Sequence, residues 1–246
     1  MPGGLLPGAG GARSICLVVG LLPAVILILS GCTTVVVRRG VEKRVERRLH
    51  EVLGPAERYE VRIRDTRDAE LVRGFARRVE VQGRRIRARD QMELETLDLA
   101  LVDLRYEGGD PYFVSVRRSD LEISFTDAAL NRYLRVHQAR YDPEIVFEPD
   151  RVRVKIVYPF LGVPTTIRAE GTFLIREGRQ LLFDADKADV SFLDQPGFGE
   201  KFVEDRVNPI LDMSRIDFPA RLESVQLLQG RIKAYGTAAL PREVRD

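Results

Sequence analysis

The chain of 246 residues contains 39 Lys or Arg and 37 Asp or Glu residues, which leaves a formal net charge of +2. A surface this densely and evenly charged produces no long-range field that would attract nucleic acid. The only cysteines are Cys16 and Cys32, so the residues after position 32 can form no disulfide framework, no Cys-based metal site and no thiol nucleophile.

The N-terminal segment has the layout of a lipoprotein signal peptide. A Gly- and Pro-rich leader with one positive charge, Arg13, precedes an apolar run over residues 15–29, and Leu29-Ser30-Gly31-Cys32 completes the segment. A basic start, a hydrophobic stretch and small residues before the cut are typical of secretory signals. The last four residues resemble a bacterial lipobox. That resemblance implies a diacylglyceryl group on the Cys32 thiol, with residues 1–31 removed as the signal peptide.

The alternative is an uncleaved transmembrane anchor. The apolar run is shorter than the about 20 residues that cross a bilayer, and Gly20 and Pro23 interrupt it. Both interpretations place the rest of the chain outside the cytoplasm, facing the periplasm or the exterior. The lipoprotein interpretation predicts a lipid anchor in the cell membrane or the outer membrane.

A tether over residues 32–39 leads into a single predicted domain over residues 40–246, which opens with an amphipathic helix from about Gly40 to Leu53. Its apolar positions recur every four residues: Val41, Val45, Leu49 and Leu53. Arg and Lys outnumber Glu on its polar sides. Beside a lipid anchor, this basic excess predicts either contact with an anionic leaflet or an ordinary docked helix with solvated arginines.

From Tyr59 onward the apolar period changes to two, which is typical of half-buried strands. Gln82-Gly83 predicts a hairpin turn. A long strand is expected from Met92 to Tyr106, and a change of phase between Leu101 and Val102 predicts a bulge within it. Strands near residues 112–116 and 121–125 extend this antiparallel meander.

In the second half, helices again interrupt runs of strands. Thr126-Asp127 forms a good N-cap and predicts a helix through about Val136. Strands are expected over 145–147, 152–158, 167–175 and 181–192, then a helix over 197–207 and a final hairpin that turns at Gln229-Gly230. Runs of strands interrupted by helices indicate an α+β fold with long antiparallel sheets.

No catalytic constellation is recognisable in the sequence. The two histidines, His50 and His137, stand far apart in the chain, and neither a Gly-x-Ser-x-Gly elbow nor a His-Glu-x-x-His motif occurs. No Gly-rich phosphate loop is present. We therefore expect no catalytic residues, no metal and no cofactor. A hydrolase interpretation would have to depend on His50 or His137.

The segment Tyr158–Pro164 is apolar where hairpin tips are normally polar. An exposed apolar tip indicates a contact with a membrane or a partner. A tip folded inward would plug the end of a cavity, and the simplest alternative is that Phe160 and Leu161 cap the core.

Three segments carry a family resemblance. They are residues 121–134, with Thr-Asp-x-x-Leu-Asn-x-Tyr-Leu at the start of the helix; 208–212 with 216–219; and the closing strand pair, 222–228 and 230–236. On these segments the chain resembles the LmeA-like phospholipid-binding family of bacterial envelope proteins. The resemblance implies phospholipid binding without known catalysis and a role in envelope lipid homeostasis or transport. Asn131, Asn208 and Pro209 in these motifs are expected to be structural.

By analogy with tubular lipid-binding proteins, a long curved antiparallel sheet would wrap one or two helices and leave an apolar groove. Each CH₂ group that the groove covers would contribute roughly 0.8 kcal/mol. The candidate lining residues are Leu97, Leu99, Leu101, Phe160, Leu161, Phe173, Ile175, Phe183, Val190, Phe192, Phe198 and Phe202. The same residues would also form the filled core of a non-enzymatic structural or adaptor lipoprotein that contacts another envelope protein.

Overall fold

A computed structural model of the protein describes residues 37–87, 92–107, 112–160, 162–190, 198–215 and 220–238. The chain divides into two compact units, residues 1–41 and 42–246. Of the first unit only residues 37–41 are described, and they are helical. The predicted signal peptide and Cys32 lie outside the described residues. No helix in the described ranges is long and apolar enough to span a bilayer.

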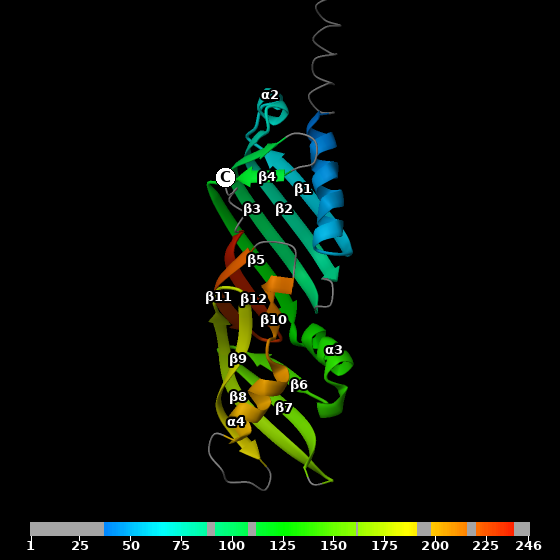
Figure 1. Ribbon diagram of the computed structural model, residues 1–246, viewed down its shortest axis with the longest axis vertical. Helices are drawn as coiled ribbons and strands as arrows, with labels where there is room; N and C mark the ends of the chain where they lie inside the picture. Colours follow the sequence, from blue (N-terminus) through cyan, green and yellow to red (C-terminus); the bar gives the residue numbers. More distant parts are fainter. Residues whose placement is uncertain are drawn as a thin grey trace, which may run out of the picture. The chain divides into compact units, whose positions relative to one another are not determined.

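Two antiparallel sheets build the second unit (Figure 1). The first has the order β1 (Ala56–Arg64), β2 (Phe75–Arg87), β3 (Glu93–Glu107), β5 (Arg118–Thr126), β12 (Arg231–Ala238) and β11 (Ala220–Leu228), with β4 (Tyr112–Ser115) paired to β3. The second has the order β10 (Leu211–Asp212), β9 (Gln180–Val190), β8 (Val163–Arg176), β7 (Arg151–Phe160) and β6 (Glu144–Glu148). β11 also contacts β6 and β8, so the last hairpin of the chain joins the two sheets.

Helices accompany both sheets and confirm the expected α+β class. The N-terminal helix covers residues 37–52, and α3 (Asp127–His137) and α4 (Phe198–Val207) lie where the sequence predicts them. Thr126 caps α3, since its hydroxyl accepts from Ala129 N at 3.1 Å. The five-residue α2 (Asp68–Val72) is an element that the sequence analysis did not predict. Two short 3₁₀ turns, η1 (Ala139–Tyr141) and η2 (Met213–Arg215), follow α3 and β10.

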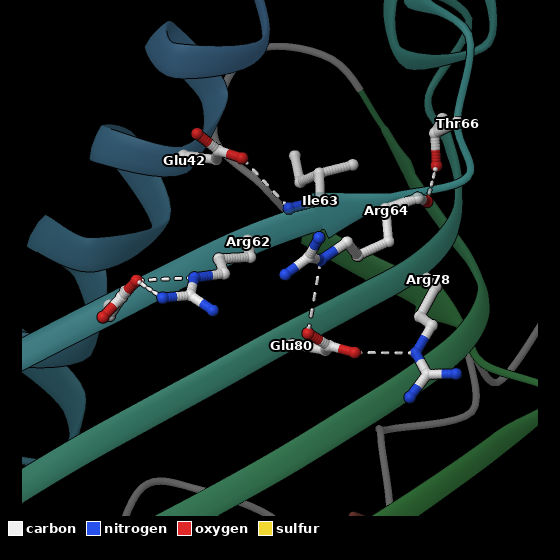
Figure 2. Close-up of polar contacts among 8 residues, drawn as sticks. Glu42, Arg62, Ile63, Arg64, Thr66, Arg78 and Glu80 are labelled. Atoms are coloured by element: carbon white, nitrogen blue, oxygen red, sulfur yellow. Dashed lines mark hydrogen bonds and ion pairs between the residues drawn. The ribbon is translucent and has the colours of Figure 1, made fainter.

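The N-terminal helix covers the open edge of the first sheet. Glu42 and Glu46 accept hydrogen bonds from Ile63 N at 3.0 Å and Val61 N at 3.2 Å, both on the outermost strand β1. Figure 2 shows Glu42 reaching this strand. Side chains four residues apart share one helix face, so the two carboxylates meet alternate strand N–H groups. The helix thereby satisfies donors that an exposed edge would otherwise offer to another chain.

The same arrangement recurs twice on the second sheet. Asn131 of α3 exchanges two hydrogen bonds with the backbone of Ile145 in edge strand β6, both at 2.7 Å. Asn208, directly after α4, binds both backbone groups of Phe183 in β9, at 2.6 and 2.8 Å. The α4 side chains Glu200 and Glu204 continue that ladder along β9, accepting from Ala188 N and Ala185 N. Both motif asparagines therefore hold strand edges, which is the structural role expected for them.

Two local predictions on the first sheet differ from the structure. The predicted turn at Gln82-Gly83 is wrong, because β2 continues through it and Gly83 pairs with Tyr59 and Leu97. A Cβ atom on Gly83 would lie 2.6 Å from Ile86 Cδ1, so glycine here makes room for packing. The pairing of β3 with β2 and β5 is continuous through Leu101 and Val102; Asp103 has a positive φ of 52°, and the register of β3 against β4 shifts between Arg105 and Tyr106.

Candidate functional site

The three candidate lining residues of β3 belong to a closed aliphatic core. Leu97, Leu99 and Leu101 are 3%, 5% and 3% exposed. They pair with the equally buried apolar rows of β2 and β5. Their neighbours in these rows include Val79, Val81, Leu121 and Ile123. This part of the first sheet therefore offers no accessible apolar surface to a ligand.

Candidate residues on the second sheet and α4 are more accessible. Phe173, Ile175, Val190 and Phe202 are half-buried, whereas Phe183 is fully buried. Phe173 and Ile175 lie near the β8–β9 turn, Val190 lies beside the start of α4, and Phe202 is on α4 itself. Phe160 and Phe198 belong by their backbone to β7 and α4, and their side chains lie outside what the structure describes. Leu161 and Phe192 lie outside the described residues altogether.

The side chains on the core-facing row of β7 become more exposed toward the end of the strand. Val152, Val154 and Ile156 are at most 1% exposed. Tyr158, the next residue on that face, is only half-buried. It leads into the β7–β8 hairpin, where Pro159, Gly162, Val163 and Pro164 are exposed and Val163 is 61% exposed. The core-facing row of β7, closed at its start, thus ends beside accessible apolar residues of the hairpin.

Aromatic rings from three elements meet over this end of β7. Tyr158 stacks on Tyr141 of η1, with ring centroids 5.8 Å apart and an interplanar angle of 27°. It meets Phe202 of α4 edge-on at 5.0 Å. The guanidinium carbon of Arg206 lies 4.5 Å from the Phe202 ring centroid and 5.1 Å from that of Tyr141. We call these four residues the aromatic–arginine cluster.

Close packing of α4 on β9 supports the cluster. Val203 and Val207 of α4 are 0% and 2% exposed and anchor the helix. At its start, a Cβ atom on Gly199 would lie 2.7 Å from Ala188 Cβ and 3.0 Å from Val190 Cγ2. Glycine therefore allows the helix to approach the strand closely. With α4 fixed in this way, Phe202 and Arg206, one turn apart, share the helix face that meets Tyr158 and Tyr141.

Three surface hollows lie elsewhere on the described residues, and charged side chains contribute to the lining of each. One of about 450 Å³ includes Glu80, Asp98, Asp120 and Glu122 on the outer face of the first sheet. The other two, of about 540 and 650 Å³, are rich in arginine. They contain ion pairs such as Arg117–Asp103 at 2.7 Å. Such linings suit water and ions and do not suit an acyl chain.

Neither histidine stands in a catalytic arrangement among the described residues. The His50 ring meets Tyr59 edge-on at 4.7 Å, and His137 meets Tyr133 at 4.2 Å at the end of α3. Within the described ranges, no group of three or more His, Cys, Asp or Glu residues could hold a metal ion.

Shifted pKa values belong to structural contacts. Burial raises the pKa of Tyr59 to about 12, and its hydroxyl donates to Gly54 O at 3.0 Å. Burial also raises the pKa of Tyr106, whose hydroxyl donates to Leu71 O. Hydrogen bonds from Lys187, and then from Arg151, lower the pKa of Glu170. None of these groups faces the aromatic–arginine cluster, so they stabilise the fold and do not form a site.

Sequence reasoning missed half of the aromatic–arginine cluster. Phe202 and the Tyr158 hairpin stood out by their apolar character, but Tyr141 and Arg206 did not. The spacing of four residues from Phe202 could have placed Arg206 on the same helix face. Nothing in the local sequence indicates Tyr141, because only the tertiary packing of η1 against β7 brings it there.

Comparison with known proteins identifies the family. No curated protein and no solved structure shows significant similarity to the chain. The model of the LmeA-like phospholipid-binding family matches residues 33–237, which include every strand and α2, α3 and α4 apart from Ala238 at the end of β12. The chain therefore belongs to the LmeA-like phospholipid-binding family, as its sequence motifs indicated.

Proposed function

We propose that the protein is a non-enzymatic envelope lipoprotein that binds a phospholipid-like lipid at the hairpin end of its second sheet. The observation that carries this proposal is the change along the core face of β7, from buried Val152, Val154 and Ile156 to half-buried Tyr158. Half-buried Val190, beside α4, and half-buried Phe202, on α4, extend the accessible apolar surface. Membership of a phospholipid-binding family supports the choice of ligand.

An acyl chain fits this end of the sheet for a simple physical reason. Apolar surface that water can reach gains free energy when a hydrocarbon chain covers it, at roughly 0.8 kcal/mol per CH₂ group. The closed rows of the first sheet can gain nothing in this way, since Leu97, Leu99 and Leu101 are already at most 5% exposed. We therefore assign lipid contact to the second sheet and structural support to the first.

The anchor completes the proposed role. A lipid on Cys32 would hold the domain at the cell membrane or the outer membrane, on the periplasmic or exterior side, where it could take up, carry or present lipid. Changing Cys32→Ala is expected to block lipid attachment and to leave the precursor uncleaved at this position. Normal processing of that variant would contradict the anchor.

Native mass spectrometry of residues 33–246, with lipid extraction in parallel, tests the binding function. Phospholipid bound at a defined stoichiometry would support it. A mass that stays free of lipid after phospholipid is added would contradict it. That result would favour the alternative of an adaptor lipoprotein with a filled core that contacts another envelope protein.

A further inference from the structure

Arg206 is held by aromatic rings, whereas many other arginines of the described sheets pair with carboxylates. Its guanidinium carbon lies over the rings of Phe202 and Tyr141, at 4.5 and 5.1 Å from their centroids. On β7, by contrast, Arg151 pairs with Glu170 at 2.7 Å and Arg153 pairs with Glu148 at 2.9 Å. Arg206 forms no ion pair with any carboxylate in the described part of the chain.

The Nε–H group of Arg206 is buried and has no hydrogen-bond partner within the described structure. A buried donor without an acceptor is costly, and native proteins rarely leave one unsatisfied. A guanidinium that stacks on aromatic rings uses its flat faces, and its N–H donors point outward in the plane of the guanidinium. Arg206 is therefore a positioned cation with unused donors, which is the arrangement that binds a bidentate oxyanion.

A second cation lies near the Tyr141 ring of the cluster. The guanidinium carbon of Arg140, in η1, is 6.0 Å from the Tyr141 ring centroid. Like Arg206, it forms no ion pair with a described carboxylate. Asp142 and Asp205, the sequence neighbours of Tyr141 and Arg206, are exposed and pair with neither arginine in the described structure. Two arginines that share Tyr141 thus carry positive charge without local neutralisation.

We propose that Arg206, assisted by Arg140, binds the phosphate group of the lipid headgroup. This inference rests on the proposed lipid-binding function and names the subsite that would recognise the polar end of the lipid. Phe202 connects the two parts, because one of its neighbours is the Arg206 guanidinium and another is the apolar row that ends at Tyr158. A phosphate at Arg206 would leave the acyl chains directed toward that row.

The position of the cluster suits contact with a membrane surface. It adjoins the hairpin whose exposed residues are Pro159, Gly162, Val163 and Pro164. Tyrosine and arginine are suited to the boundary between hydrocarbon and water, because each combines an apolar body with a polar end. A lipid could thus enter with its chains toward the sheet while its phosphate stays at the rim.

The test compares two lipids that differ in the phosphate. Full-length protein in a non-ionic detergent is offered phosphatidylglycerol and diacylglycerol with identical acyl chains, and native mass spectrometry measures the ratio bound. We expect the wild type to prefer phosphatidylglycerol. Changing Arg206→Gln should reduce this preference about tenfold, as expected for one charge-assisted partner, and leave diacylglycerol uptake unchanged. Arg206→Lys should have an intermediate effect, because it keeps the charge and loses the planar donors.

Arg151→Gln is the matched control, since it removes an arginine of the second sheet that already has a carboxylate partner. Thermal melts confirm that each variant folds. An unchanged lipid preference in the Arg206→Gln variant, or an equal loss in the control, would overturn the inference.

Phosphorus NMR with inorganic phosphate separates the sources of the phosphate group. Arg206-dependent binding of inorganic phosphate by a protein that takes up neither lipid would uphold the phosphate site and overturn the lipid-binding function. A protein that binds neither lipid nor phosphate would overturn both.

Discussion

The two sheets use the same alternation of apolar and charged residues but end in different ways. In the first sheet, Val81, Leu99 and Leu121 lie on neighbouring strands and are 2%, 5% and 3% exposed. In the second sheet the row of β7 is equally closed at Ile156 and then opens at Tyr158. The difference shows that alternation identifies the face that points inward, while the covering elements decide whether that face remains accessible.

Matched valine substitutions would sharpen this contrast most strongly. Val81→Ala removes two buried methyl groups and leaves a cavity, so it should lower the free energy of unfolding by about 2.5 kcal/mol. Val190→Ala, at a half-buried position, should cost less than about 1 kcal/mol and reduce lipid occupancy. Urea unfolding and native mass spectrometry measure the two effects. Equal losses of stability would show that the second sheet is as closed as the first.

The strand edges offer a second comparison between the sheets. Asn208→Ala removes both hydrogen bonds to the backbone of Phe183, a residue 1% exposed, and leaves a buried N–H without an acceptor. We expect a loss of about 2 kcal/mol. Glu42→Ala removes one bond to Ile63 N at a partly buried position and should cost about 1 kcal/mol or less. Chemical denaturation of both variants distinguishes a structural Asn208 from a dispensable one.

Alkaline pH should weaken the first sheet through Tyr59. Burial raises the pKa of Tyr59 from 10.0 to about 12, so its contribution is complete below pH 10, where the tyrosine is neutral in both states. Above pH 10 only the unfolded chain ionises it, and stability falls by about 1.4 kcal/mol per pH unit until the folded pKa is reached. At pH 11 the Tyr59→Phe variant should therefore have lost about 1 kcal/mol less than the wild type, relative to pH 9. An identical pH dependence would contradict this assignment.

The sequence predicted the inward-facing residues well because packing follows the period of two along a strand. It also located α3, α4 and the closing hairpin, whose signals are local: the Thr126 cap, the helical spacing before Asn208 and the Gln229-Gly230 turn. It failed at Gly83, where a glycine that makes room for Ile86 and Tyr59 resembles a turn residue. A glycine that forms a turn and a glycine that makes room for packing cannot be distinguished in the sequence, because the difference depends on the neighbouring strands.

The candidate site was predictable only in part, for a related reason. Leu97 and Val190 have the same apolar character in the sequence, yet the first is 3% exposed and the second half-buried. Their exposure differs because different elements of the tertiary structure, the strands around Leu97 and α4 beside Val190, cover them. The same limit hid Tyr141 and Arg206, whose meeting depends on η1 and α4 approaching β7 from different parts of the chain.

The smallest effect on stability should come from Val163, at the hairpin that borders the aromatic–arginine cluster. Its side chain is 61% exposed, so Val163→Ser should change the free energy of unfolding by less than about 0.5 kcal/mol. If the hairpin meets the membrane, the same change should weaken binding to phospholipid vesicles, because an exposed apolar residue is lost from the contact. Leu174→Ser is the matched control: its side chain is 49% exposed, and it lies near the other end of β8. Vesicle flotation that falls for Val163→Ser and not for Leu174→Ser would assign membrane contact to one end of the second sheet, whereas equal behaviour of the two would remove the hairpin from the mechanism.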